Sequence, residues 1–190
     1  MEALRTHLAL KNPRFQCRDV SEKHSLVVKL KSKVGAPAKA PELKRLRALA
    51  GSAYRLLEPL YRQFNGLILH THRRTSGLVV APVAQLPELM ADWKASMDYL
   101  EPNELYPFQR KGIPFATIDG SGNYFVAHGR NIYYADHDGG DDAVWGKSVE
   151  DFFARALGDP AKFLYDAGCY TRYFDGKTDR QYIPEEFLHD

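Results

Sequence analysis

The segment that comes nearest to a known chemical motif is Gly146-Lys147-Ser148, at the start of an expected helix. A phosphate-binding loop needs the spacing Gly-x-x-x-x-Gly-Lys-Ser/Thr, because successive backbone N–H groups must wrap the phosphates. The nearest preceding glycine, Gly140, is separated from Gly146 by five residues rather than four. Asp141 and Asp142 lie between them and would repel a polyphosphate. We therefore expect no nucleotide site, with Gly146 in a turn and Ser148 as a helix N-cap.

Four aspartates stand close together just before this motif: Asp136, Asp138, Asp141 and Asp142. A helix–loop–helix calcium site needs acidic residues at loop positions one, three and five and glycine at position six. Asp136 and Asp138 fit the first two of these positions, but Gly140 falls at the fifth and Asp141 at the sixth. The segment is therefore expected to be either a solvated acidic loop or a partner-binding loop.

Histidines and cysteines supply no complete catalytic or metal-binding set. The histidines considered as metal ligands are His70, His72, His128 and His137. His70 and His72 would share one face of a strand, but no third ligand is fixed beside them. Cys17 and Cys169 each lack a nearby histidine, and no Gly-x-Ser-x-Gly turn occurs. Because no acid, base and nucleophile converge, we expect a non-enzymatic protein with no metal and no cofactor.

Charge and composition narrow the class of protein. Residues 1–50 carry 12 Lys and Arg against 4 Asp and Glu, whereas residues 101–190 carry 9 against 16. No nucleic-acid-binding motif accompanies the basic segment, so the asymmetry favours electrostatic steering of a charged partner over nucleic-acid binding. With no apolar run long enough for a membrane helix, no secretory signal and two cysteines, the sequence predicts a cytoplasmic protein without membrane contact.

Periodicity places the elements that would position these residues. Apolar residues at spacings of three and four from Leu43 to Phe64 predict two consecutive helices, the second beginning near Pro59, and Asn65-Gly66 ends them. Leu86, Leu89, Trp93, Met97 and Leu100 mark another amphipathic helix. Further helices are expected from Ser148 to Gly158 and over 161–166. The expected strands are 25–31, 67–71, 78–80, 113–118, 123–127 and 131–135.

The three strands from 113 to 135 are joined by short turns that contain glycine, which predicts an antiparallel meander. We expect Phe115, Ile118, Phe125 and Ile132 to be buried in it. The chain is thus predicted to be a single α+β domain with a mixed, largely antiparallel sheet flanked by helices. We expect residues 1–40 to form an N-terminal extension with a strand, residues 41–168 the domain, and residues 169–190 a C-terminal appendage with a hairpin around Asp175-Gly176.

The order of five segments resembles that of the SUKH superfamily, over residues 41 to 158. The segments are Leu57-Glu-Pro-Leu-Tyr-Arg-Gln-Phe-Asn-Gly66, Gly77-Leu-Val-Val with the Trp93 helix, Pro114 to Val126, Ile132-Tyr-Tyr-Ala-Asp-His-Asp138 and Ser148-Val-Glu-Asp-Phe-Phe153. This superfamily includes the yeast cell-wall assembly regulator, the bacterial Syd protein and immunity proteins encoded beside polymorphic toxins. The resemblance implies a function in binding proteins, without shared catalytic residues.

The resemblance further implies an immunity protein that neutralises a contact-dependent or secreted bacterial toxin. The alternative is a regulatory or scaffold protein-interaction module unrelated to toxins. Carboxylates on the loop after residue 135 would suit a basic toxin cleft, and neighbouring aromatic side chains would anchor the contact. The expected partner-binding residues are Asp136, Asp138, Asp141, Asp142, Tyr133, Tyr134 and Trp145.

Overall fold

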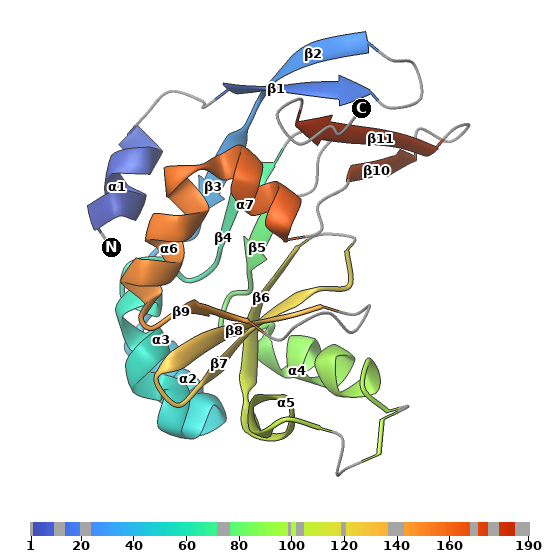
Figure 1. Cartoon of the computed structure of the whole chain (residues 1–190). Coiled ribbons are helices and arrows are strands. Elements are labelled where there is room, and N and C mark those ends of the chain that lie inside the picture. The colour runs from blue at the N-terminus through green and yellow to red at the C-terminus, as the bar shows by residue number, and fades with distance from the viewer. Residues whose placement is uncertain are drawn as a thin grey trace.

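Two antiparallel sheets organise the chain (Figure 1). The computed structural model describes residues 2–9, 14–19, 24–71, 77–98, 100–101, 105–118, 121–136, 143–167, 171–174 and 179–184. Helices pack on the larger sheet, so the protein belongs to the α+β class, as the sequence predicts. Within these residues, no helix is both long and apolar enough to cross a membrane.

The larger sheet has seven strands that lie side by side in chain order, β3-β4-β5-β6-β7-β8-β9. Its strands are β3 (Lys31–Val34), β4 (Leu67–Thr71), β5 (Leu78–Val80), β6 (Ile113–Ile118), β7 (Tyr124–His128), β8 (Asn131–Ala135) and β9 (Val144–Gly146). Each neighbouring pair is antiparallel. The expected meander over 113–135 is therefore confirmed, and β3, β4, β5 and β9 extend it on both sides.

The smaller sheet joins the two ends of the chain. Its strands are β1 (Arg14–Asp19), β2 (His24–Lys29), β10 (Thr171–Phe174) and β11 (Asp179–Pro184), in the order β10-β11-β1-β2. β10 and β11 pair antiparallel, as in the hairpin expected from the sequence, and β11 also pairs with β1. The N-terminal helix α1 (Glu2–Ala9) packs against α6, with Leu4 fully buried. The two terminal segments are thus tied to each other and to the domain.

One face of the larger sheet carries the main core. It is covered by α2 (Ala40–Ala50), α3 (Tyr54–Tyr61), α6 (Val149–Gly158) and α7 (Pro160–Asp166) (Figure 1). The four residues expected at its centre are 0 to 1% exposed, which confirms that part of the prediction: Phe115, Ile118, Phe125 and Ile132. Phe125 contacts four other buried rings, those of Tyr134, Trp145, Phe152 and Phe163.

Two expected helix boundaries are wrong. The break between α2 and α3 falls at Gly51, which has a positive φ of 51°, and Pro59 lies inside α3 rather than at its start. The lost backbone donor at Pro59 is tolerated because α3 buries Leu57 and Leu60 completely. The helix expected to reach Leu100 ends instead at Ala95. There the Ser96 hydroxyl donates to the Trp93 carbonyl at 2.8 Å and competes with the helical pattern.

The Asn65-Gly66 step joins three segments of the domain. The Asn65 amide donates to Glu42 at 2.6 Å in α2 and accepts from the backbone N–H of Val83 at 2.8 Å. The backbone N–H of Asn65 donates to Ala36, and the Gly66 carbonyl accepts from Gly35. Gly66 has a φ of 89°, a conformation that a residue with a Cβ adopts only with strain. This step therefore fixes how the chain leaves α3 and enters the sheet.

Tyr61 provides a prediction about alkaline stability. Its fully buried hydroxyl donates to the Ala81 carbonyl at 2.8 Å, and burial raises the pKa of this phenol far above its usual value. The folded state therefore holds this proton more tightly than the unfolded state, whose tyrosines ionise near about pH 10. The contribution to stability is complete below that pH and decreases above it, by about 1.4 kcal/mol per pH unit.

This pH dependence is measured by urea unfolding of the wild type and Tyr61→Phe between about pH 8 and about pH 11. Because phenylalanine does not ionise, the variant lacks this part of the alkaline decrease, and the stability difference between the two proteins changes with pH. Parallel curves would contradict the buried position of the Tyr61 hydroxyl.

Candidate functional site

The Gly146-Lys147-Ser148 segment is used to start α6. The Ser148 side chain accepts from the backbone N–H of Asp151 at 3.0 Å, which confirms the expected N-cap. The Asp151 carboxylate in turn accepts from the backbone N–H of Lys147 at 2.9 Å. A Cβ on Gly146 would lie 2.9 Å from the Phe152 backbone nitrogen, so glycine serves close packing here. Two backbone N–H groups at this helix start, those of Lys147 and Asp151, are thus already bonded to side chains.

The candidate metal ligands do not come together in the part of the chain that is described. His70 is fully buried in β4, and its Nε2 lies 2.8 Å from the Ala156 carbonyl oxygen. His128 is half-buried at the end of β7. Among the described residues, no group of three or more His, Cys, Asp or Glu could hold a metal ion. His72, His137, Cys169 and the side chain of Cys17 lie outside the description.

The seven expected partner-binding residues fall in different environments. Tyr134 and Trp145 are each 5% exposed and stack with ring centroids 4.6 Å apart inside the main core. Their burial leaves little of either side chain for a partner, because aromatic contacts with Phe125 already use both rings. Tyr133 points to the opposite face of the sheet, where it is half-buried. Asp136 is half-buried beyond β8, and Asp138, Asp141 and Asp142 lie outside the described residues.

The face on which Tyr133 lies is covered by two helices, α4 (Leu86–Ala95) and α5 (Pro107–Lys111), and we call it the α4–α5 face (Figure 1). It has a small core of its own, separate from the main core. That core consists of Trp93, Phe108, Val126 and Ala135, with Met97, Tyr124 and Tyr133 half-buried beside it. The sheet is therefore apolar on both faces and is covered on both by helices, which explains why β6, β7 and β8 lack an alternating pattern.

Three aromatic rings form a row on the α4–α5 face. The Phe108 ring is nearly parallel to the Tyr133 ring, at 6° and 4.5 Å between centroids. The Tyr106 ring also stacks on Phe108, at 15° and 6.2 Å between centroids. Phe108 is 4% exposed, but Tyr106 at the end of the row is 58% exposed. The row thus begins in the core and ends in solvent.

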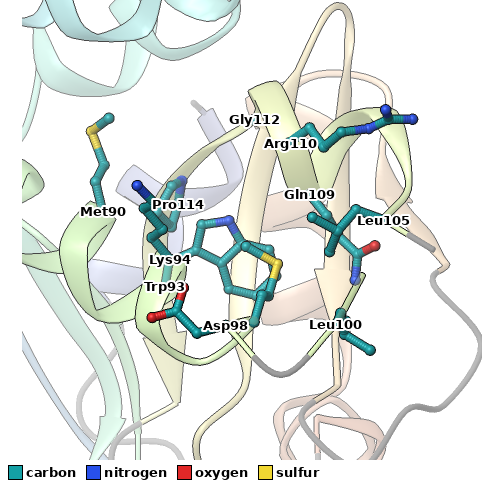
Figure 2. Close-up of a pocket in the computed structure, with 11 residues that line it drawn as sticks. Met90, Trp93, Lys94, Asp98, Leu100, Leu105, Gln109, Arg110, Gly112 and Pro114 are labelled. Atoms are coloured by element: carbon teal, nitrogen blue, oxygen red, sulfur yellow. The ribbon is translucent and has the colours of Figure 1, made fainter. Parts of the chain in front are cut away.

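A pocket of about 450 Å³ opens between α4 and α5 (Figure 2). Its lining comes from α4, from the chain that follows α4, and from α5 with the start of β6. The residues are Met90, Trp93, Lys94, Met97, Asp98, Leu100, Leu105, Gln109, Arg110, Gly112 and Pro114. The Trp93 indole lies in the middle of these side chains (Figure 2). The volume is that of a site for a small molecule or for one or two side chains of a protein partner.

The polar atoms of this pocket are mainly hydrogen-bond donors. The indole Nε1 of Trp93 is buried and has no hydrogen-bond partner among the described residues. The Gln109 side chain accepts from the backbone N–H of Tyr106 at 2.8 Å, which leaves its NH₂ group for other contacts. Lys94 and Arg110 are exposed at the rim, and Asp98 is the carboxylate of the lining. The pocket therefore combines an apolar interior with donors and two cations.

Tyr124 of β7 packs against Trp93 from the side of the sheet. Its ring contacts the Trp93 ring at 5.0 Å between centroids. Burial and the nearby Asp92 carboxylate raise the pKa of the Tyr124 phenol, so it stays protonated at neutral pH. Tyr124 is paired with Ala135 in the register of β7 and β8. The acidic segment that follows Ala135 therefore begins beside the α4–α5 face.

Sequence reasoning missed α5 and with it the pocket. The available signal was Tyr106-Pro107, since proline favours the first position of a helix. The Gln109 side chain completes the start of α5 by accepting from the N-cap backbone N–H. A five-residue helix leaves too short a periodicity to be recognised, so Tyr106 was not expected at the surface.

No protein-family model matches the chain, and no curated protein matches it either.

Proposed function

We propose that this chain is a non-enzymatic protein-binding domain and that the α4–α5 face is its partner surface. The exposed Tyr106 ring beside the pocket carries the proposal, because it continues a row of stacked rings out into solvent. Tyrosine, tryptophan, methionine and arginine are enriched where protein partners bind most strongly. Tyr106, Met97 and Arg110 bring three of these types to this one surface, and the buried Trp93 ring lies among the pocket residues beneath them.

The proposed partner is a bacterial toxin that the chain neutralises in the cytoplasm. The SUKH-like order of segments over 41–158 supports this class of partner by analogy. The acidic segment 136–142 supports it physically, because toxins that cut nucleic acid present basic clefts. That segment starts one residue after Ala135, whose partner Tyr124 contacts Trp93. Asp136, the first residue of that segment, thus follows directly after the strand that carries Tyr133 of the aromatic row.

The test uses the genes that flank this one. Each flanking reading frame is expressed in a host alone and together with this chain, and growth is followed. We expect one product to stop growth alone, growth to resume on co-expression, and the two proteins to elute as one complex. A flanking product that binds without being toxic would contradict the toxin assignment and favour the regulatory alternative. Failure of every flanking product to bind would contradict the function as a whole.

The acidic loop gives a prediction about association kinetics. Replacing Asp138, Asp141 and Asp142 together with asparagine removes three charges, while the half-buried Asp136 is kept. Because charges at an interface act mainly on the association rate, we expect about a tenfold slower association with the toxic product and a flatter salt dependence. Surface plasmon resonance at several salt concentrations measures both quantities.

The melting temperature of this triple variant should equal that of the wild type, which separates steering from folding. An unchanged association rate, with full protection of cells, would show that the partner surface does not include this loop.

A further inference from the structure

We propose that the pocket between α4 and α5 binds an apolar side chain of the partner that stands next to a carboxylate, such as leucine or phenylalanine beside aspartate or glutamate. This inference rests on the proposed protein-binding function and names the chemistry of the segment that enters the pocket. It is carried by three features of the described lining: the apolar interior, the donor groups and the charges at the rim.

The interior of the pocket selects an apolar group. Met90, Met97, Leu100, Leu105 and Pro114 line it together with the Trp93 ring. Methionine side chains are flexible and polarisable, so they adapt to inserted side chains of different shape. Burial of such a group removes apolar surface from water on both partners, which favours association.

The donors select an occupant that brings oxygen atoms. Trp93 is 6% exposed, and its Nε1–H lacks a partner among the described residues although it is a donor only. An indole N–H buried without a partner is unfavourable. Because the nitrogen itself is covered, an oxygen of a ligand would satisfy it only when the flexible side chains of the lining move aside. The Gln109 side chain lies in the same lining (Figure 2), and its NH₂ group forms no hydrogen bond with the described residues. A carbonyl or carboxylate oxygen meets both requirements.

The rim selects a negative charge. Lys94 and Arg110 come from the last turns of α4 and α5, and both are exposed. Within the described part of the chain, neither forms an ion pair, whereas the lining holds Asp98 as its carboxylate. The two cations therefore exceed the one anion, and a carboxylate of the partner would be attracted to them. This contact is opposite in sign to that of the acidic loop, so one partner could use both with distinct segments.

The probe is an acetylated and amidated peptide, Asp-Asp-Leu-Asp-Asp, added to the ¹⁵N-labelled full chain. The protein has two tryptophans, Trp93 and Trp145, and their two indole N–H signals are assigned with Trp93→Phe. We expect the Trp93 signal to move downfield and to saturate at millimolar peptide, since its N–H gains an acceptor, while the Trp145 signal stays in place. No movement of the Trp93 signal would overturn the proposal.

Two further peptides test separately whether the pocket requires the carboxylate and whether it requires the apolar side chain. The peptide Asn-Asn-Leu-Asn-Asn lacks the charge, and Asp-Asp-Ala-Asp-Asp lacks the large apolar side chain, so both should bind more weakly. If Asn-Asn-Leu-Asn-Asn binds as tightly as the first peptide, the requirement for a carboxylate is wrong. If Asp-Asp-Ala-Asp-Asp does, the requirement for a large apolar side chain is wrong.

Octanoate joins an apolar chain to a carboxylate in a small molecule. If octanoate saturates the Trp93 signal and the first peptide does not move it, the pocket is a small-molecule site and the proposal is wrong.

Charge reversal provides the matched variants. Lys94→Glu with Arg110→Glu should weaken peptide binding about tenfold. Lys44→Glu with Arg45→Glu makes the same charge change on exposed positions of α2, on the opposite face of the sheet, and should leave binding unchanged. If both pairs have the same effect, net charge rather than the pocket is responsible, and the proposal fails.

The experiments distinguish a failure of the pocket proposal from a failure of the proposed function. Protection of cells by the Lys94 and Arg110 variant at the wild-type level would overturn the pocket and leave the neutralising function intact. Peptide binding in the pocket without binding of any flanking gene product would support the pocket and contradict the proposed partner.

Discussion

Ile118→Asp should leave no soluble folded protein. Ile118 is 1% exposed in β6, where it is paired with Leu78 of β5 and faces the main core. A carboxylate there would be buried without a partner, at a cost of several kcal/mol. Because folded domains are stable by only about 5 to 15 kcal/mol, that cost removes most or all of the stability.

The effect is measured as the soluble fraction after expression and as the thermal transition in circular dichroism. Arg130→Asp is the matched control, since Arg130 is exposed at the turn between β7 and β8 and also receives an aspartate. The control should melt like the wild type. A folded Ile118→Asp protein with an unchanged melting temperature would contradict the position of β6 at the centre of the sheet.

Tyr106→Ser should cause the largest loss of partner binding of any exposed single substitution. Tyr106 is the most exposed residue of the aromatic row, and its ring stacks on that of Phe108. Truncating a tyrosine at the centre of an interface costs about 2 kcal/mol or more, which is about thirtyfold in Kd. Calorimetric titration with the toxic flanking product measures the loss.

Val34→Ser is the control for this experiment. Val34 is 39% exposed, but it lies in β3, at the edge of the seven-stranded sheet opposite β9. Removing its apolar surface should leave the affinity unchanged. Equal affinity of Tyr106→Ser and the wild type would mean that the aromatic row does not contact the partner.

The central strands could be predicted from the sequence because their apolar runs and the turns between them are local patterns. Four expected strands, 67–71, 78–80, 113–118 and 131–135, coincide with β4, β5, β6 and β8, and the short glycine turns between β6, β7 and β8 indicate their order. The strands β1 and β9 were missed for a physical reason. β1 (Arg14–Asp19) has Phe15 and Cys17 as its apolar residues and is held between β2 and β11, and β9 has three residues, so both patterns are too short to be recognised.

Only part of the candidate site could be predicted from the sequence. Tyr133 was selected with Tyr134, but alternation along β8 sends adjacent side chains to opposite faces, so Tyr134 entered the main core. Trp145 was selected for its position next to the acidic segment, yet it stacks on Tyr134 and lies under the Arg155 guanidinium at 4.0 Å. The pocket depends on α5 and on the chain after α4, which meet only in the folded protein.

Backbone hydrogen exchange with and without the toxic flanking product is the most direct test of the α4–α5 face as the partner surface. Binding is expected to slow exchange in residues 86–98, 105–111 and 131–136, which contain α4, α5 and β8. Exchange in residues 40–61, which contain α2 and α3 on the other side of the sheet, should stay the same. Slower exchange confined to residues 40–61, with none in α4 and α5, would contradict the proposed surface.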